Sequence, residues 1–258
     1  MKLEENKDFD YNKKLELTTK AHYTAVIEED EYKIRELADY DKDINYIVDL
    51  GANIGTASWQ FNHYFPNAKI LVCEPEPELL EYARRNTGNK LTYIQEAIIG
   101  DDRKEVTFNI CRWEGNGHVD GNFRWDLFAP MGSEKVGQIQ VKASTLKDII
   151  DRYEFPQIDL LKIDTEGMEG QILTKFKPYL SVVKHFRGEW HGDIDREIIR
   201  EALKDTHDIF IDRRLKTHGD FFATRKDIAD NLKRVEEKNG FKIIKRVGLP
   251  DKVQYDSN

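Results

Sequence analysis

The chain has 258 residues, 39% of them hydrophobic and 34% charged, and its formal net charge is −8. This length and composition predict one globular domain with a sizeable core, and the aromatic content of 11% excludes a disordered chain. The acidic balance disfavours nucleic acid as a partner, because a negative protein repels phosphate backbones. No stretch approaches the roughly 18 apolar residues of a membrane span.

The N-terminus and the cysteines bear on the cellular compartment. Residues 1–11 are charged and lack the apolar segment of a signal peptide, and Cys73 and Cys111 have no metal-binding or CxxC spacing. We therefore expect a cytoplasmic protein with two free thiols.

The first 43 residues are polar and have a helical pattern. Tyr32, Ile34 and Leu37 recur at near-helical spacing before the pattern changes to short apolar runs. We predict an N-terminal helical cap over residues 1–43 and a Rossmann-like domain over residues 44–258.

Three short apolar runs alternate with helical patterns at the start of the predicted domain. The first run is followed by Gly51 and the second by Glu74-Pro75, and short apolar runs bounded in this way are typical of buried parallel strands. The resulting β-α-β-α-β order predicts an α/β fold with a doubly wound, mostly parallel sheet and helices on both faces. The predicted strands span residues 45–50, 69–73 and 91–94, and the helices between them span residues 56–65 and 77–86.

The pattern changes again after the third strand. Residues 105–110 and 138–142 alternate as half-buried strands do, and residues 111–137 between them are rich in glycine and aromatic residues. We predict a β-hairpin and loop insertion between strands 3 and 4, lying over the carboxyl edge of the sheet. Trp113, Trp125 and Phe128 in this loop either stack on a sugar ring or cover the site, or simply pack beneath the loop.

The alternation of strands and helices resumes after the insertion. At the C-terminus, the pattern predicts a helix over residues 226–238, ended by the cap pair Asn239-Gly240, and a final strand over residues 241–247. The remaining predicted helices span residues 145–153, 166–176 and 194–203, and the remaining strands span residues 158–163, 182–189, 209–213 and 221–224.

The turn after the first strand is the first candidate cofactor site. Its spacing is GxxxG, and Asn53 stands where the dinucleotide fingerprint GxGxxG has its middle glycine. A pyrophosphate needs that glycine, whereas a cationic amino-acid cofactor needs a nearby acid such as Asp49. This disfavours an NAD-dependent oxidoreductase, although such a motif alone can be no more than a tight turn. The candidate cofactor-binding residues here are Asp49, Gly51, Ala52, Asn53, Ile54 and Gly55.

Two further strand ends extend this candidate site. Glu74 follows the second strand, 23 residues after Gly51, where a carboxylate can accept hydrogen bonds from both ribose hydroxyls. Glu96 and Ala97 follow the third strand, where polar groups can reach an adenine edge. Because the carboxyl ends of parallel strands meet at one crevice, we predict that these residues and Pro75 bind one cofactor.

Three segments together resemble the FkbM family of methyltransferases. They are residues 48–55, the pair Glu74-Pro75 and residues 158–169, where the motif LLKIDTEGMEG is the most specific. The resemblance covers roughly residues 45–192. It implies a class I Rossmann-like methyltransferase fold with a seven-stranded sheet whose last strand is antiparallel. It also implies S-adenosylmethionine as cofactor, S-adenosylhomocysteine as product, and O-methylation of a hydroxyl of a sugar, glycan or related metabolite.

The same motif offers a candidate base. Lys162 and Asp164 are two residues apart on a predicted strand, so they share a face at its carboxyl end. Burial lowers the pKa of a lysine, which would let Lys162 take the proton of the acceptor hydroxyl while Asp164 orients the cofactor or the lysine. The alternative is an internal ion pair without a chemical role. Glu166, at the start of the next predicted helix, faces the same opening.

A second candidate base follows the next strand. Glu189 and His191 share a face opposite to Trp190, and an imidazole titrates near neutral pH. The sequence leaves open whether Lys162 or His191 is the base. A divalent cation is conceivable here, although we do not favour one. Its ligands would be Asp164, Glu166, Glu189 and His191.

The competing function is a catalytically inactive protein that binds S-adenosylmethionine or a nucleotide through the same fold. The charged strand interior at Lys162 argues against it. A nucleic-acid methyltransferase is disfavoured by the net charge, and no stretch combines basic residues with spaced stacking aromatics. We expect a small-molecule or glycan acceptor, and the sequence does not specify its identity or the oligomeric state.

Overall fold

A seven-stranded sheet forms the centre of the computed structural model, which describes residues 16–88, 90–111, 116–121, 134–212, 217–229, 233–238 and 241–246. Strand β11 runs antiparallel to both of its neighbours, and the other strand pairs of this sheet are parallel. This confirms the predicted class I order with one reversed strand. In spatial order the strands are β10 (His207–Ile211), β11 (His218–Arg225), β9 (Val183–His191), β8 (Ile158–Ile163), β1 (Tyr46–Leu50), β2 (Lys69–Cys73) and β3 (Thr92–Ile94).

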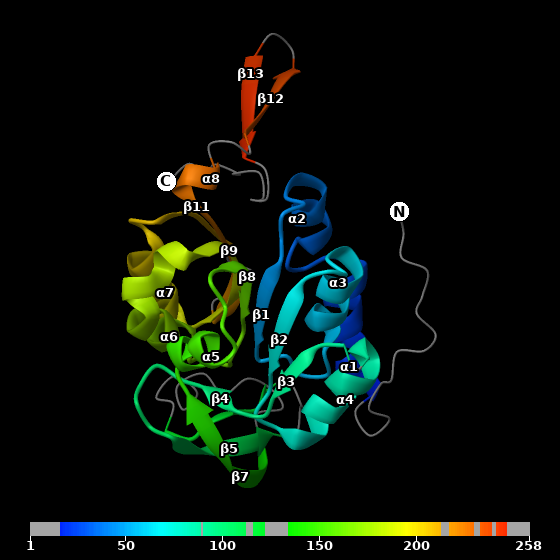
Figure 1. Cartoon of the computed structure of the whole chain (residues 1–258), viewed down its shortest axis with the longest axis vertical. Helices are drawn as coiled ribbons and strands as arrows, with labels where there is room; N and C mark the ends of the chain where they lie inside the picture. Colours follow the sequence, from blue (N-terminus) through cyan, green and yellow to red (C-terminus); the bar gives the residue numbers. More distant parts are fainter. Residues whose placement is uncertain are drawn as a thin grey trace.

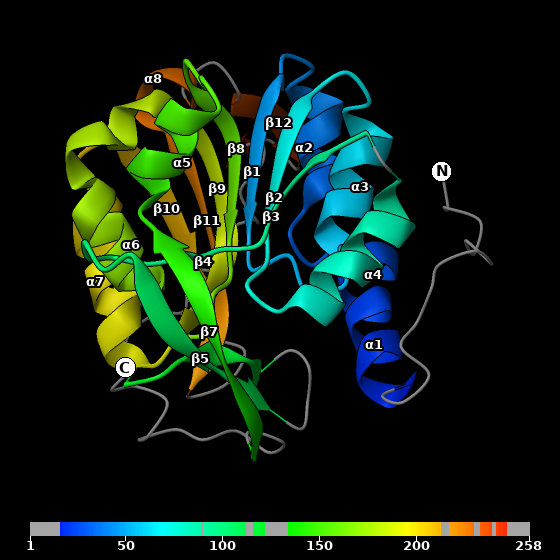
Figure 2. The same ribbon diagram turned by 60° about the horizontal axis from the view of Figure 1, so that its bottom comes forward.

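Helices cover both faces of the sheet (Figures 1 and 2). Consecutive residues of a strand point to opposite faces, so Ile47 of β1 packs in one hydrophobic core and Val48 in the other. One face carries α1 (Glu16–Tyr23), a π-helical turn (Thr24–Glu28), α2 (Ile34–Tyr40), α3 (Thr56–Tyr64) and α4 (Pro77–Thr87), and the other carries α5 (Leu146–Arg152), α6 (Glu169–Phe176) and α7 (Asp193–Leu203).

The insertion between β3 and β8 forms a second, four-stranded sheet of order β4-β7-β5-β6. Its central pair, β5 and β7, is antiparallel, which confirms the predicted hairpin. Trp113, Trp125 and Phe128, to which we gave a possible stacking or covering role, lie outside the described residues. The strands are β4 (Ala97–Ile98), β5 (Glu105–Cys111), β6 (His118–Val119) and β7 (Lys135–Ser144).

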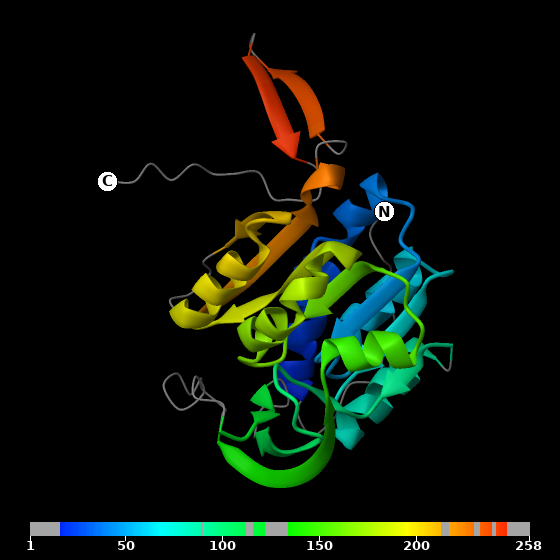
Figure 3. The same cartoon turned by 60° about the vertical axis from the view of Figure 1, so that its left-hand side comes forward.

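The prediction of one long C-terminal helix is wrong. Helix α8 spans only Lys226–Ala229, and β12 (Lys233–Lys238) pairs antiparallel with β13 (Phe241–Arg246) in a hairpin that projects beyond the main sheet (Figures 1 and 3). Lys238 is opposite Phe241, so two residues join the strands. Their identities are asparagine and glycine, a pair that signals a two-residue hairpin more strongly than a helix cap.

One helix boundary also differs from the sequence prediction. We predicted that α6 begins at Glu166, but it begins at Glu169. Glu166 and Gly167 have φ angles of 55° and 96°, which a right-handed helix does not accommodate. The three residues before the helix therefore form a tight turn at the end of β8.

Two smaller predictions can be compared with the structure. Cys73 and Cys111 are both buried and unbridged, as expected. Among the described residues, no helix has the length and apolar composition needed to cross a membrane.

Candidate functional site

A cavity of about 270 Å³ opens at the carboxyl ends of β1, β2 and β8. The N-terminal segment and the inserted sheet complete its walls, through residues such as Tyr32 and Phe108. Most of the predicted site residues line it. They are Gly51, Ala52, Asn53, Glu74, Pro75, Glu96, Ala97, Lys162, Asp164 and Glu166.

The remaining predicted site residues lie behind the cavity wall. Ile54 is fully buried in the core, and Gly55 caps the N-terminus of α3 with a φ of 84°. Asp49 is also fully buried, and its Oδ2 accepts a hydrogen bond of 2.5 Å from Ser58 Oγ. His191 lies behind Glu166, with 3.4 Å between its Nε2 and Glu166 Oε2.

The glycine-rich turn is held against the neighbouring strands. Gly51 has a φ of 74°, and a Cβ there would lie 1.8 Å from the carbonyl oxygen of Asp164. The N–H groups of Gly51 and Ala52 both donate to the carbonyl of Cys73 at 3.0 Å. Only glycine fits this position, because the main chains of β1 and β8 approach each other so closely.

Glu74 is fixed at the end of β2 by main-chain donors. Its Oε2 accepts from the N–H of Asn53 at 2.9 Å, and its Oε1 accepts from the N–H of Glu76 at 3.0 Å. Burial raises its pKa to about 7. Each oxygen retains a lone pair, so the carboxylate can accept further hydrogen bonds from a ligand.

Lys162 joins the glycine-rich turn to Asp49. It is only 3% exposed, and its Nζ donates to the carbonyl of Gly51 at 2.6 Å and to that of Leu50 at 3.3 Å. Asp49 Oδ1 lies 3.5 Å from the same nitrogen. The lysine therefore stabilises the conformation of the turn.

The prediction that Lys162 has a lowered pKa is wrong. Burial does lower the pKa of this ammonium, but the charges of Asp164 and Asp49 outweigh burial and raise it overall. Sequence reasoning considered burial without these two nearby carboxylates. Since the group stays protonated at neutral pH, it is not suited to take a proton from a hydroxyl.

Asp164 follows β8 and contacts the N-terminal segment. Its Oδ2 accepts a hydrogen bond of 3.0 Å from the hydroxyl of Tyr32 and lies 3.6 Å from Lys162 Nζ. Its Oδ1 is buried and accepts no hydrogen bond from the described part of the chain. The protein thus leaves part of the hydrogen-bonding capacity of this carboxylate unused.

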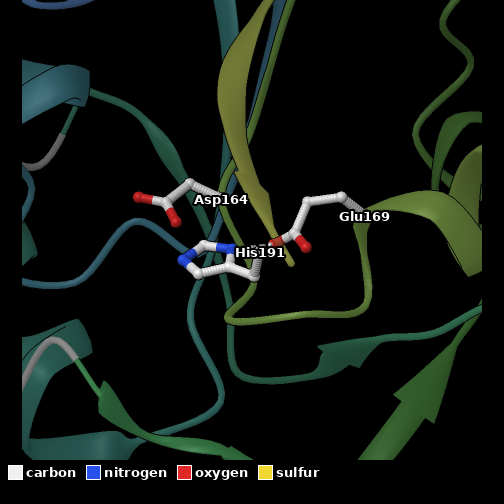
Figure 4. Close-up of side chains that lie close together, drawn as sticks. All are labelled: Asp164, Glu169 and His191. Carbon is white, nitrogen blue, oxygen red and sulfur yellow. Dashed lines mark ion pairs between the residues drawn. The ribbon is translucent and has the colours of Figure 1, made fainter. Parts of the chain in front are cut away.

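A second charged cluster surrounds His191 at the end of β9 (Figure 4). Its Nδ1 lies 3.4 Å from Glu169 Oε1, and its Nε2 lies 3.4 Å from Glu166 and 3.6 Å from Glu189. Trp190, between Glu189 and His191 on the same strand, is fully buried in the core. One imidazole is therefore shared by three carboxyl groups.

These carboxyl groups differ in how the protein affects their pKa values. Burial raises the pKa of Glu166 to about 8, and burial together with Asp164 raises that of Glu189 well above its usual range. For Glu169, burial is outweighed by His191 and by hydrogen bonds, which lower the pKa to about 2. Burial lowers the pKa of His191, but the acids around it raise that pKa well above 6.5.

Two groups of side chains have the spacing of metal ligands within the described residues. Asp164, Glu169 and His191 each offer a ligand atom within 4.8 Å of the others. However, the oxygens of Glu169 already accept hydrogen bonds from the N–H groups of Thr165 at 2.6 Å and Gly167 at 3.0 Å. This use of Glu169 argues against a cation there. The second group is Glu31, Glu189 and Asp220.

Glu96 lines the cavity, but its carboxylate is bound to the inserted sheet and α5. Its Oε1 lies 2.7 Å from Lys142 Nζ and 2.6 Å from Arg152 Nη1, and its Oε2 accepts from Ser144 Oγ. Burial raises the pKa of this group, but the three donors outweigh burial and lower it.

Sequence reasoning did not assign three residues that the structure places at this site. Tyr32 and His22 line the cavity from the N-terminal segment, and burial lowers the pKa of His22. Glu169 anchors the turn after β8. The motif LLKIDTEGMEG contains Glu169 and could have drawn attention to it, whereas no local pattern links the two N-terminal residues to β8.

Comparisons with known proteins give a family match. The family model described as Methyltransferase FkbM domain matches residues 49–212, more than half of the chain. Methyltransferase sdnD of Sordaria araneosa is 28% identical over 163 residues, 50% of this chain and 59% of that protein. The 2-O-methyltransferase NoeI of Sinorhizobium fredii is 25% identical over 169 residues, 61% of this chain and 66% of that protein.

Another relative is hexuronic acid methyltransferase AglP of Haloferax volcanii, 23% identical over 176 residues, 67% of this chain and 66% of that protein. The chain thus spans 59% to 66% of the length of these curated relatives. Among solved structures, precorrin-6y C5,15-methyltransferase from Geobacter metallireducens has a TM-score of 0.48 at 13% identity, covering 86% of this chain and 96% of that one.

Proposed function

The chain belongs to the FkbM family of methyltransferases, and from this premise we propose that it transfers a methyl group from S-adenosylmethionine to a hydroxyl of a sugar, glycan or related small metabolite. The observation that carries the proposal is the convergence of Gly51, Glu74 and Asp164 on one cavity at the carboxyl edge of the sheet.

The residues of the cavity fit this cofactor. Glu74 can accept hydrogen bonds from the ribose hydroxyls, because its oxygens are only partly used by the main chain. The partly satisfied carboxylate of Asp164 suits the ammonium group of the methionine portion. Gly51 allows the main chain to approach the ligand without a side chain. When bound, the cofactor supplies an electrophilic methyl group.

The acceptor hydroxyl must lose its proton as the methyl group is transferred. We assign this task to Glu166, which lines the cavity, with His191 behind it as the group that orients and stabilises it. A carboxyl with a pKa of about 8 is matched to proton transfer near neutral pH. Lys162 has a different task in this proposal: it stabilises the glycine-rich turn.

The acceptor is proposed from the relatives. NoeI is named a 2-O-methyltransferase and AglP a hexuronic acid methyltransferase, which supports a hydroxyl on a sugar-like molecule. The net charge of −8 supports a small molecule or glycan over nucleic acid. We further propose that residues 1–43 form a cap on a methyltransferase domain of residues 44–258, and that no divalent cation is required.

Calorimetric titration with S-adenosylhomocysteine tests the cofactor assignment. We expect the wild type to bind in the micromolar range, a loss of at least about tenfold in Glu74→Ala, and wild-type affinity in Glu81→Ala, which alters an exposed acid on α4. A folded wild type that does not bind would refute the proposal. Transfer from labelled S-adenosylmethionine to a panel of sugars would then separate the enzyme from an inactive binding protein.

A further inference from the structure

The N-terminal segment reaches a cavity whose walls come mainly from the residues that match the family model. The family match begins at residue 49, yet residues before it form part of the cavity wall. These residues come from α1, the π-helical turn and the loop before α2, which share a core with α3 (Figure 1). They are Ala21, His22, Ala25, Val26, Glu31 and Tyr32.

Tyr32 makes the most specific contact of this segment. It is 3% exposed, its hydroxyl donates to Asp164 Oδ2 at 3.0 Å, and its ring centroid lies 5.6 Å from Lys162 Nζ. Burial and the neighbouring carboxylates, Asp164 first among them, raise the pKa of the phenol well above 10. The hydroxyl therefore remains a hydrogen-bond donor at all pH values at which the protein works.

The contact fixes a carboxylate that would otherwise rotate. A short acidic side chain on the turn after β8 has two rotatable bonds, and Lys162 is 3.6 Å from it, too far for a strong hydrogen bond. The hydroxyl of Tyr32 is the hydrogen-bond donor that the structure records for the side chain of Asp164. Removing that hydroxyl leaves the carboxylate in place but lets its orientation vary.

We propose that Tyr32 is a positioning residue for the cofactor: it orients the Asp164 carboxylate toward the ammonium group of the amino-acid portion of S-adenosylmethionine. This inference rests on the proposed function. It makes the segment before the family domain a working part of the site, and it predicts an effect confined to one end of the ligand. In the proposed arrangement the adenosine end would lie at Glu74 and Glu96, after β2 and β3, whereas the hydrogen bond of Tyr32 is made to Asp164 after β8.

The test compares two ligands that share the adenosine end. S-adenosylhomocysteine carries the ammonium group, and 5′-methylthioadenosine lacks the whole amino-acid portion. In Tyr32→Phe we expect affinity for S-adenosylhomocysteine to fall about tenfold, because a charge-assisted contact loses its orientation, while affinity for 5′-methylthioadenosine stays within about twofold of the wild type. Tyr93→Phe is the matched control, since it removes a hydroxyl bonded to Thr87 on α4, outside the cavity.

Each result has one meaning. A selective loss for S-adenosylhomocysteine in Tyr32→Phe alone supports the inference. Unchanged affinity for that ligand, or an equal loss for both ligands, would overturn it, because a general structural defect weakens both. If the wild type binds neither ligand, the proposed function itself fails. If the wild type binds S-adenosylhomocysteine and Tyr32→Phe binds it equally well, only the inference about Tyr32 fails.

Discussion

Two charged clusters lie side by side at the carboxyl edge of the sheet, and they are built differently. Around Lys162, one ammonium group is matched by Asp49 and by the carbonyls of Leu50 and Gly51. Around His191, one imidazole faces three carboxyl groups. In the first cluster the ammonium group has Asp49 and Asp164 beside it and holds main chain in place, whereas the second cluster has three carboxyl groups for one imidazole and can hold or release a proton near neutral pH.

The difference has a physical cause. Burial destabilises the charged form of any group, and nearby groups of opposite charge stabilise that form. Lys162 has enough carboxylates near it that its pKa rises despite burial. In the second cluster one imidazole faces three buried acids, and burial keeps the pKa values of Glu166 and Glu189 raised. For Glu169, His191 and hydrogen bonds that include the N–H of Thr165 outweigh burial, and its pKa is lowered.

The largest expected effect comes from removing the ammonium group of the first cluster. Lys162→Met leaves Asp49 buried without its partner and takes a donor from the carbonyl of Gly51. We expect the free energy of unfolding to fall by about 3–5 kcal/mol and S-adenosylhomocysteine binding to be lost, because the turn is no longer held. Urea denaturation and calorimetry measure the two effects.

The control for this variant is Lys175→Met on α6, whose lysine is exposed and paired with Asp102. That change is expected to leave both measurements unaltered. If Lys162→Met instead keeps its stability and its affinity but loses activity, then the lysine is a base after all, and the contrast between the two clusters is wrong.

The next effect comes from the second cluster. Glu166→Gln keeps the shape of the side chain but cannot take a proton, so we expect kcat to fall about a hundredfold while affinity for S-adenosylhomocysteine changes by less than about threefold. Glu201→Gln, at an exposed position on α7, is the control. Unchanged kcat would remove Glu166 from the reaction.

The same variant reports on the pH dependence of stability. The pKa of Glu166 is about 8 in the folded protein and about 4.5 when exposed, so the unfolded state releases this proton first. Stability from this group is therefore present below about pH 4.5 and is lost as pH rises to about 8, by about 1.4 kcal/mol per pKa unit. We expect a flatter curve of unfolding free energy against pH in Glu166→Gln, and parallel curves would contradict the raised pKa.

Local signals were sufficient to predict much of the fold and many of the residues that line the cavity. Strand lengths, glycine turns and the acids that follow strands predicted β1, β2 and β8, and with them Gly51 and Glu74. These signals depend on neighbours in sequence, and the class I order then brings the strand ends together.

What could not be predicted depends on contacts between distant segments. Tyr32 bonds to a residue 132 positions away, and no period or spacing indicates such a pair. The net pKa of Lys162 depends on which acids lie within 4 Å, which strand register decides. The prediction of a helix over residues 226–238 was wrong for another reason. A charged segment followed by an Asn-Gly pair is compatible with the end of a helix and also with the turn of a hairpin.

The smallest expected effect concerns Glu96, which we predicted to bind the cofactor. Glu96 lines the cavity as Glu74 does, but it is bonded to the charged groups of Lys142 and Arg152, whereas Glu74 has main-chain donors alone. A carboxylate held by two cations has little hydrogen-bonding capacity left for a ligand. We therefore expect Glu96→Gln to lower the free energy of unfolding by about 1 kcal/mol and to change S-adenosylhomocysteine affinity by less than about threefold. A loss as large as that of Glu74→Ala would mean that Glu96 contacts the adenine, and that its bonds to Lys142 and Arg152 orient it for that contact.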